Sequence, residues 1–239
     1  MTTNDFSSQF DVLLNSYATT ARFGTTDHPG TIQLDEYEKS LLLTKAQEDI
    51  AIELYSGRNT IGASFEETEE MRRYLSKLVM EARIEPDTSS DKKGIDKNSK
   101  FFNLPPDLWF ITYESVDISN GKCDSMTTMD VYPVTQDEYN RIKRNPFRGA
   151  NDRRALRLDL SDNVVEIVSK YTVTEYYIRY LRKLKPIILV NLGKDQEIRK
   201  GGSDVSDCEL PETLHQRILD RAVQLALLSR GYTRENNRE

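Results

Sequence analysis

The spacing of apolar residues changes along this chain, and the change separates a helical part from a part built of strands. Up to residue 85 the apolar residues recur every three or four positions, as on one face of an α-helix. Beyond residue 100 they alternate with polar residues over short runs, as in half-buried β-strands. Residues 86–100, between the two parts, carry almost no apolar side chains. They predict a flexible polar loop that contributes little to a core.

Two amphipathic helices are predicted before residue 58. The first is expected to begin at Asp5, its N-cap, and to end before the His28-Pro29-Gly30 turn. The second is expected to begin at Asp35, where Glu38 completes a capping box, and to end at Gly57. The expected apolar faces are Phe6, Phe10, Leu13, Leu14 and Tyr17 in the first helix, and Leu42, Ala46, Ile50 and Leu54, with Leu43 and Ile61 nearby, in the second.

Two further helices are predicted, one directly after the second helix and one near the C-terminus. One follows a second capping box, formed by Ser64 and Glu67, and the other runs from Pro211 to Gly231. The C-terminal helix is expected to pack back on the N-terminal helices. The expected buried residues are Met71, Leu75, Leu78 and Val79 in the earlier helix, and Leu214, Ile218, Ala222 and Leu225 in the later one.

The middle of the chain predicts mostly antiparallel strands with one short helix inserted. Asn120-Gly121 is a strong turn signal, so the first two strands are expected to form a hairpin. The inserted helix is expected to start at Thr135, boxed with Glu138, and to stop at Asn145-Pro146. Pro186 should split or bend the last strand. The expected strands are residues 108–118, 125–134, 155–160, 164–170 and 176–192.

This order of elements predicts an α+β fold in which an N-terminal helical bundle, a β-rich middle part and a C-terminal packing helix form one composite domain. The expected parts are a helical region (1–85), the polar loop (86–100), a β-rich region (101–209), the C-terminal helix (210–231) and a tail (232–239).

Formal charge is distributed unevenly along the chain. Residues 1–120 carry 12 Lys and Arg against 21 Asp and Glu, whereas residues 121–239 carry 21 against 18. In a ring built from head-to-tail contacts, an acidic surface of one subunit can face a basic surface of the next. The N-terminal residues lack the basic and apolar regions of a secretory signal, and no apolar run is long enough to span a membrane. We therefore expect a protein of a cytoplasm-like compartment with no membrane partner.

Motifs that carry catalysis or bind cofactors are missing from the sequence, which predicts a non-enzymatic protein without cofactor or metal. There is no glycine-rich phosphate loop, GxSxG or HExxH motif, and Cys123 and Cys208 stand alone. His28 and His215 are the two histidines, and His215 is expected to lie partly exposed at a helix start. A catalytic metal is the weaker alternative, with candidate ligands Asp107, Glu114, Asp117, Asp159 and Glu175.

One cluster of basic residues is the strongest candidate for a functional surface. A second basic group, Arg179 to Lys185, is interleaved with Tyr176, Tyr177 and Tyr180. Such clusters suit either a subunit interface or the phosphates of DNA, and the acidic overall charge favours the interface. The acidic partner in a neighbouring subunit is expected to be Glu66, Glu67, Glu69 and Glu70. The members of the main basic cluster are Arg141, Lys143, Arg144, Arg148, Arg153, Arg154 and Arg157.

Three blocks of the sequence, in the same order, resemble virion structural proteins of crAss-like phages and related Bacteroides phages. The blocks are LDEYEKSLLLTKAQEDIAIELYSG with SFEETEEMRRYL, then YPVTQDEYNRIKRNPFRGANDRRALRLDL, then CELPETLHQRILDRAVQLALLSRG. Together they reach from about Phe10 to Gly231. The resemblance implies no catalytic residues.

The resemblance implies a ring or head-to-tail connector protein of the portal-proximal tail. It further implies a homo-oligomeric ring of twelve-fold symmetry that binds the portal protein and neighbouring ring proteins. Packaged DNA would pass through its lumen without sequence-specific contact. On this reading the protein is assembled in the host cytoplasm and located in the virion. The alternative is a DNA-contacting packaging or regulatory protein without catalytic activity, which predicts salt-sensitive binding to duplex DNA.

Overall fold

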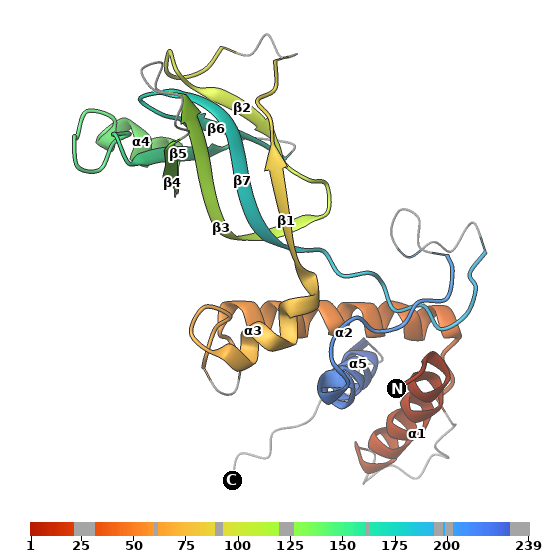
Figure 1. Ribbon diagram of the computed structural model, residues 1–239. Coiled ribbons are helices and arrows are strands. Elements are labelled where there is room, and N and C mark those ends of the chain that lie inside the picture. Colours follow the sequence, from red (N-terminus) through yellow and green to blue (C-terminus); the bar gives the residue numbers. More distant parts are fainter. Residues whose placement is uncertain are drawn as a thin grey trace. The chain divides into compact units, whose positions relative to one another are not determined.

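The computed structural model describes residues 1–21, 32–59, 62–88, 93–119, 127–160, 163–193, 198 and 203–229. The expected turns at His28-Pro29-Gly30 and Asn120-Gly121, the helix stop at Gly231 and the tail lie outside these residues. The chain has the expected α+β composition, with five α-helices and seven strands among the described residues (Figure 1). It divides into a helical unit, residues 1–77 with 184–239, and a sheet unit, residues 78–183.

Helix α1, Thr3–Ala21, opens the helical unit. Thr2 and Asp5 exchange hydrogen bonds: the Thr2 N–H donates to the Asp5 carboxylate (2.9 Å) and the Asp5 N–H donates to the Thr2 hydroxyl (3.3 Å). Thr2 therefore caps the helix, and the prediction that Asp5 is the N-cap is wrong by one turn. The buried stripe is narrower than predicted, because Tyr17 is 41% exposed. It consists of Phe6, Phe10 and Leu14.

Helix α2, Glu36–Ser56, has the predicted boundaries. Asp35 and Glu38 form the capping box, and Gly57 ends the helix in the left-handed conformation at φ +75°. The buried face is turned slightly from the predicted one: Leu43 is fully buried, whereas Leu42 is half-buried. The buried apolar residues are Leu43, Ala46, Ile50, Ala51 and Leu54.

The third predicted helix is shorter than the sequence pattern indicates. Helix α3 is Glu69–Leu75, capped by Thr68, and continues as a single 3₁₀ turn, Ser76–Leu78. In the turn before α3 the Ser64 N–H donates to the Glu67 carboxylate at 2.7 Å, so the predicted capping box lies outside the helix. Val79 starts a strand rather than completing the helix.

Helix α5, His215–Ser229, completes the helical unit and follows a 3₁₀ turn, Glu212–Leu214. It packs against α1 and α2, and Arg217 forms an ion pair with Glu53 of α2 at 2.6 Å. Residues 184–193 also belong to this unit. The N–H groups of Ile187 and Leu189 donate to the hydroxyls of Thr44 (3.0 Å) and Ser40 (3.1 Å) on α2. None of the described helices is long and apolar enough to cross a membrane.

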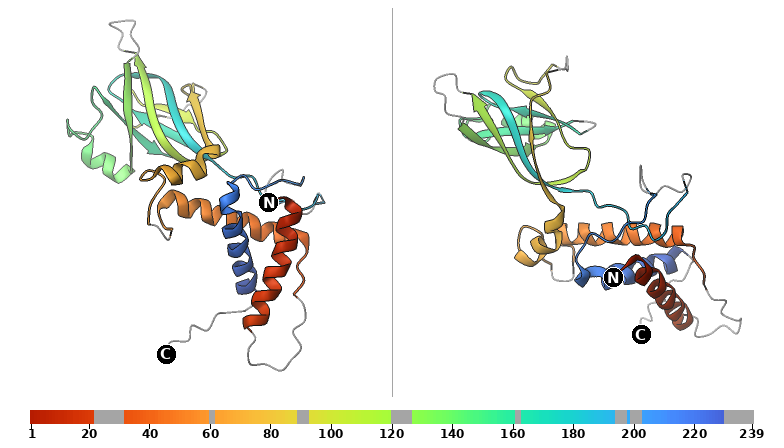
Figure 2. Two further views of the ribbon diagram at one scale, coloured as in Figure 1. Left: turned by 60° about the horizontal axis from the view of Figure 1, so that its bottom comes forward. Right: turned by 45° about the vertical axis from the view of Figure 1, so that its right-hand side comes forward.

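The sheet unit is built on one curled seven-stranded sheet of order β1-β7-β3-β4-β5-β6-β2 (Figure 2). Neighbouring strands are antiparallel except β4 and β5, which are parallel and joined through helix α4, Gln136–Ile142. The predicted pairing of the first two middle strands is confirmed, since β3 and β4 are antiparallel. The strands are β1 Val79–Ile84, β2 Lys100–Asn103, β3 Leu108–Ser119, β4 Thr127–Val134, β5 Arg154–Asp159, β6 Val164–Val168 and β7 Thr172–Arg182.

Two predictions about strands are wrong for the same physical reason. Strand β1, which the periodicity placed in a helix, pairs with β7 along its whole length, from Val79 opposite Leu181 to Ile84 opposite Tyr176. Strand β7 ends at Arg182, so Pro186 lies beyond the sheet rather than splitting a strand. In both places the strand is set by its pairing partner rather than by the local sequence: β1 pairs with β7, and β7 ends at Arg182, opposite the first residue of β3.

Apolar residues lie on both faces of the sheet. The larger cluster includes Phe102, Val116, Ile167, Tyr176 and Ile178, which are all fully buried. On the other face α4 covers β5 and β6 with a smaller cluster. Its members are Tyr139, Ile142, Leu156, Leu158 and Val168.

The polar segment 86–100 lies within the sheet unit. The Ile95 N–H donates to the buried Glu166 carboxylate at 2.6 Å, and the Asn98 side chain donates to the Lys170 carbonyl at 2.8 Å. Its described residues are therefore attached to β6 and the residues directly after it.

Candidate subunit-interface surfaces

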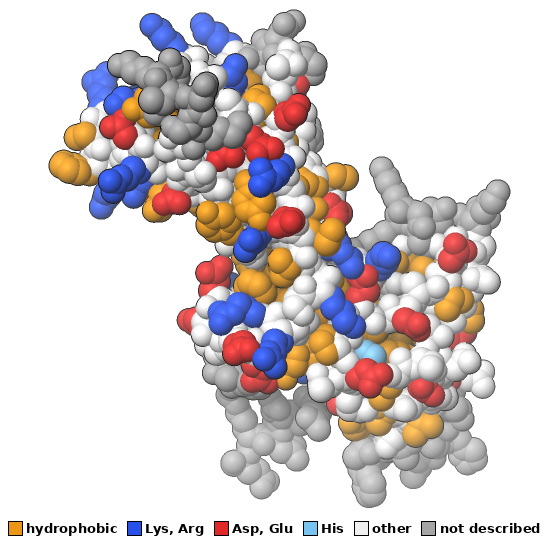
Figure 3. Space-filling view, in the orientation of Figure 1, with side chains coloured by type: hydrophobic (Ala, Val, Ile, Leu, Met, Phe, Trp, Pro, Cys, Tyr) orange, Lys and Arg blue, Asp and Glu red, His pale blue; other side chains and the backbone are white. Residues whose placement is uncertain are grey.

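The predicted basic cluster divides into an exposed group and an internal one. We call Arg141, Lys143, Arg144, Arg148 and Arg153 the basic surface; all five are exposed, on α4 and the loop that follows it. No ion pair joins any of them to an acidic side chain within the described part of the chain. Figure 3 shows Lys and Arg side chains gathered over the part of the sheet unit that bears α4.

Arg154 and Arg157 are used inside the sheet unit. The Arg154 guanidinium lies 4.1 Å from the centre of the Tyr132 ring. Arg157 is 9% exposed and pairs with Glu114 at 2.9 Å and with Asp159 at 2.9 Å. The prediction that Arg157 belongs to the basic interface surface is wrong, because its side chain is buried and its charge is neutralised by Glu114 and Asp159 on the strands.

A buried cluster surrounds Arg157. The Tyr176 hydroxyl donates to the same Glu114 oxygen that pairs with Arg157, at 2.6 Å. Burial raises the pKa of Glu114, and the charge of Arg157 opposes that rise. Burial lowers the pKa of Arg157, but Glu114, Tyr176 and Asp159 together outweigh burial and the net shift is upward. The cluster holds β3, β5 and β7 together rather than facing a ligand.

The predicted acidic surface consists of four exposed glutamates at the start of α3: Glu66, Glu67, Glu69 and Glu70. Two of them have partners on the same helix: Glu69 pairs with Arg73 at 2.8 Å, and the Tyr74 hydroxyl donates to Glu70 at 2.6 Å. Exposed pairs of this kind are weak and exchange readily for other partners.

The second basic group is also divided by the fold. Tyr176 and Tyr180 are buried in the core of the sheet unit. Tyr177 lines a shallow hollow of about 500 Å³ on the open face of β1, β7, β3 and β4, and the Arg83 and Arg179 guanidinium groups lie 5.6 Å and 5.8 Å from its ring centre. The hollow is polar, with Glu81, Asp117 and Thr128 also in its wall.

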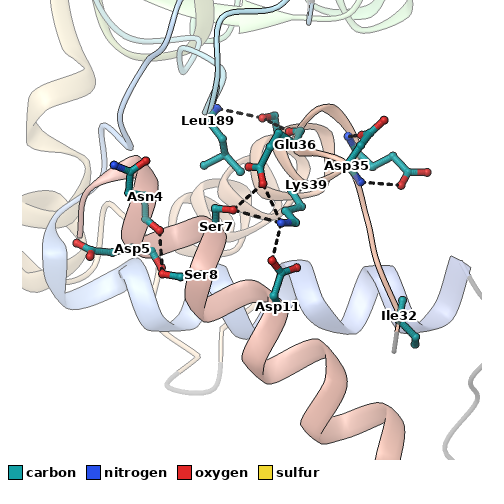
Figure 4. Close-up of polar contacts among 12 residues, drawn as sticks. Asn4, Asp5, Ser7, Ser8, Asp11, Ile32, Asp35, Glu36, Lys39 and Leu189 are labelled. Carbon is teal, nitrogen blue, oxygen red and sulfur yellow. Dashed lines mark hydrogen bonds and ion pairs between the residues drawn. The ribbon is translucent and has the colours of Figure 1, made fainter. Parts of the chain in front are cut away.

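A Ser–Lys pair in the helical unit has the spacing of a catalytic dyad but not its protonation state. The Lys39 ammonium is 3.2 Å from the Ser7 hydroxyl, 2.7 Å from Asp11 and 2.9 Å from Glu36 (Figure 4). Burial lowers the pKa of Lys39, but the hydrogen bonds to the two carboxylates and their negative charges together outweigh burial and raise the pKa above its ordinary value. Lys39 therefore stays protonated and cannot remove a proton from Ser7. It links α1 to α2.

The other chemically reactive side chains have structural surroundings. His215 is 5% exposed, not partly exposed as predicted, and its Nε2 lies 3.0 Å from the Leu210 carbonyl oxygen. Burial lowers its pKa. Burial also raises the pKa of the Cys208 thiol to about 11, so this thiol is a poor nucleophile at neutral pH.

The candidate metal-binding carboxylates do not converge. Glu114 and Asp159 pair with Arg157, Glu175 pairs with Arg83 at 2.9 Å, and the hydroxyl of Thr128 donates to Asp117 at 2.8 Å. Asp107 accepts from the Tyr180 hydroxyl at 3.2 Å. Among the residues with described positions, no three His, Cys, Asp or Glu side chains are grouped so that they could hold a metal ion.

Phe147 lies between Arg144 and Arg148 of the basic surface, and a search for charged residues does not find it. Its side chain is 84% exposed, more than any other large apolar residue recorded as exposed in the described chain. The signal in the sequence is a single aromatic residue inside RNPFRG, a segment otherwise composed of residues typical of turns and basic surfaces.

Comparison with known proteins supports the resemblance seen in the sequence blocks. A family model described as phage tail ring protein 3/4 matches residues 1–238. Ring protein 3 of Bacteroides phage crAss001 is 47% identical over 234 residues, which cover 96% of each chain. Ring protein 4/5 of the same phage is 34% identical over 234 residues, which cover 95% of this chain and 92% of that protein. The chain belongs to the phage tail ring protein 3/4 family of crAss-like phages.

Proposed function

We propose that this protein is a non-enzymatic structural subunit of a closed ring in the connector between the phage head and tail. Copies associate head-to-tail, so that one surface of each subunit contacts a different surface of the next. The ring binds the portal protein or adjacent ring proteins and forms part of the conduit for packaged DNA. Twelve copies would match the symmetry expected from the family resemblance. Assembly takes place in the host cytoplasm.

The observation that carries this proposal is the separation of charge between the two units. The helical unit contains 16 Lys and Arg against 22 Asp and Glu, a formal charge of −6, whereas the sheet unit contains 17 of each. Within the neutral sheet unit the basic surface is exposed and forms no ion pair with any acidic side chain whose position is described. An acidic helical unit and an exposed basic surface on the other unit suit heterologous contacts, in which the basic surface of one copy faces the helical unit of another.

The relatives support contacts between different rings as well. Two proteins of one phage, named ring protein 3 and ring protein 4/5, are both similar to this chain over nearly its full length. We infer that related subunits form separate rings of similar size, which can stack on one another.

Native mass spectrometry of the purified protein, alone and mixed with the portal protein of its phage, tests the proposal. A closed ring, or a stoichiometric complex with the portal, is the expected result, and it would give the copy number. A monomer that neither self-associates nor binds the portal protein or a neighbouring ring protein would overturn the proposal.

Charge reversal tests the role of the basic surface. Arg144→Glu with Arg148→Glu should abolish ring formation while leaving the melting temperature unchanged, because both side chains are exposed and form no ion pair among the described residues. Lys93→Glu with Lys97→Glu is the matched control, with the same change in charge at two exposed positions of the same unit. Normal assembly of the arginine variant, or equal loss in both variants, would contradict a specific role for this surface.

Binding to duplex DNA is the second candidate function, favoured by the five exposed cations of the basic surface. It predicts that the isolated subunit binds duplex DNA with an affinity that falls steeply as salt increases. The acidic helical unit opposes this reading, since it repels phosphates. A fluorescence anisotropy titration at two salt concentrations distinguishes the two functions.

A further inference from the structure

Phe147 is placed on the surface in a way that suits an anchor for another protein. Single apolar residues are common on protein surfaces, so exposure alone carries little weight. Phe147 differs in two respects: the backbone that carries it is tightly fixed, and its nearest charged neighbours in the sequence are two exposed arginines, Arg144 and Arg148.

The loop that carries Phe147 is held by hydrogen bonds of one residue. The Asn145 side-chain oxygen accepts from the N–H groups of Phe147 (2.9 Å) and Arg148 (3.2 Å), and its carbonyl accepts from the Gly149 N–H (2.7 Å). A Cβ at Gly149 would lie 2.8 Å from that carbonyl oxygen, so the turn is too tight for another residue. The Arg154 guanidinium donates to the Phe147 carbonyl at 3.3 Å. A loop fixed before binding loses little conformational entropy when it binds.

The surroundings of Phe147 have the composition of a binding hot spot. Arg144, Arg148 and Arg153 are exposed nearby in the sequence, and aromatic residues and arginine are the types enriched at the centres of interfaces. Duplex DNA is a poor partner for such a loop, because its bases are stacked inside and its phosphates would leave the Phe147 ring in water.

The helical unit offers an apolar surface bordered by acids. Ile52 of α2 is 39% exposed, and Tyr55, one turn later on the same helix, is half-buried with its ring centre 6.0 Å from that of Phe65. The Phe65 N–H donates to the Tyr55 carbonyl at 3.3 Å, which brings the neighbouring Glu66 close to this turn of α2. Burial is the main cause that raises the pKa of Tyr55, and the charge of Glu66 adds to it. We call Ile52, Tyr55 and Glu66 the acceptor surface.

We infer that Phe147 anchors each subunit to the next copy of this chain in the ring by packing on the acceptor surface, between Ile52 and Tyr55. Arg144 and Arg148 then face Glu66 and Glu67 of that copy. The inference rests on the ring assembly proposed above and adds to it the residues in contact. It fits the charges of both partners, since the basic surface meets the unit that carries the whole net charge of the chain.

A photo-crosslinking amino acid at position 147 tests the contact directly in assembled rings. Irradiation should link residue 147 of one copy to a peptide containing residues 48–67 of another, identified by mass spectrometry. A link to a different part of the neighbouring copy, a link to DNA, or no link between copies would overturn the inference.

The variant Phe147→Ala measures the contribution of the anchor. Truncation of a hot-spot aromatic weakens association by at least about thirtyfold, so the variant should remain monomeric at concentrations where the wild type forms rings. Ile95→Ala is the matched control, since Ile95 is a 52% exposed apolar residue in the same unit. If the wild type assembles and Phe147→Ala assembles equally well, the anchor is wrong but the ring stands. If the wild type forms no ring under any of these conditions, ring assembly itself fails.

Discussion

Removal of Arg157 should unfold the sheet unit more readily than the loss of any exposed ion pair. Its guanidinium is 2.9 Å from the Glu114 carboxylate, and both side chains are only 10% exposed. Coulomb's law at that distance, with an effective dielectric constant of about 20, gives an attraction of about 6 kcal/mol, which the cost of removing both charges from water partly offsets. Arg157→Met leaves Glu114 buried with the Tyr176 hydroxyl as its remaining donor, so we expect a loss of about 3–5 kcal/mol in the free energy of unfolding.

Urea denaturation at pH 7 measures this loss, and two further variants test its cause. Arg83→Met removes the exposed pair with Glu175, whose arginine is 67% exposed, and should cost less than about 1 kcal/mol. Adding Glu114→Gln to Arg157→Met should recover part of the lost stability, because a neutral amide is cheaper to bury than an unpaired carboxylate. If Arg157→Met costs no more than Arg83→Met, or if the double variant is less stable than Arg157→Met, the buried-charge reasoning is refuted.

Two predictions concern the helical unit. Lys39→Met leaves the carboxylates of Asp11 and Glu36 facing each other without a cation and should cost about 1–3 kcal/mol in thermal unfolding. Because the pKa of Lys39 is raised in the folded protein, its contribution to stability is fully present below its ordinary pKa of 10.5 and is lost as pH rises through the raised pKa. If the difference in stability between the wild type and Lys39→Met is unchanged at pH 12, this reasoning is contradicted. Gly57→Ala should cost about 1–2 kcal/mol, since the residue has φ +75° and the new Cβ would lie 3.1 Å from the Ser64 nitrogen; an unchanged melting temperature would show that the turn relaxes freely.

Elements whose signals are local could be predicted from the sequence. The Asp35–Glu38 capping box and Gly57 set both ends of α2, and Thr135 sets the start of α4, because a cap involves only residues three or four apart. Strand β1 could not be found in this way. Its residues follow directly on a helix, and the partner that makes them a strand, β7, lies about a hundred residues further along the chain.

The candidate site was predictable only as far as charge along the chain corresponds to charge on the surface. Seven basic residues lie close together between Arg141 and Arg157, yet five are exposed and two are used internally. Arg157 is withdrawn from the surface by its ion pair with Glu114, which lies on β3. No sequence pattern links these two residues. The exposure of Phe147 cannot be predicted from charge, because an apolar residue is expected to be buried. It follows from the turn at Asn145, whose hydrogen bonds hold residues 145–149 in a closed loop outside the core. Packing on another copy of the chain, as proposed above, would remove the Phe147 ring from water and would place the neighbouring cations opposite an acidic helical unit.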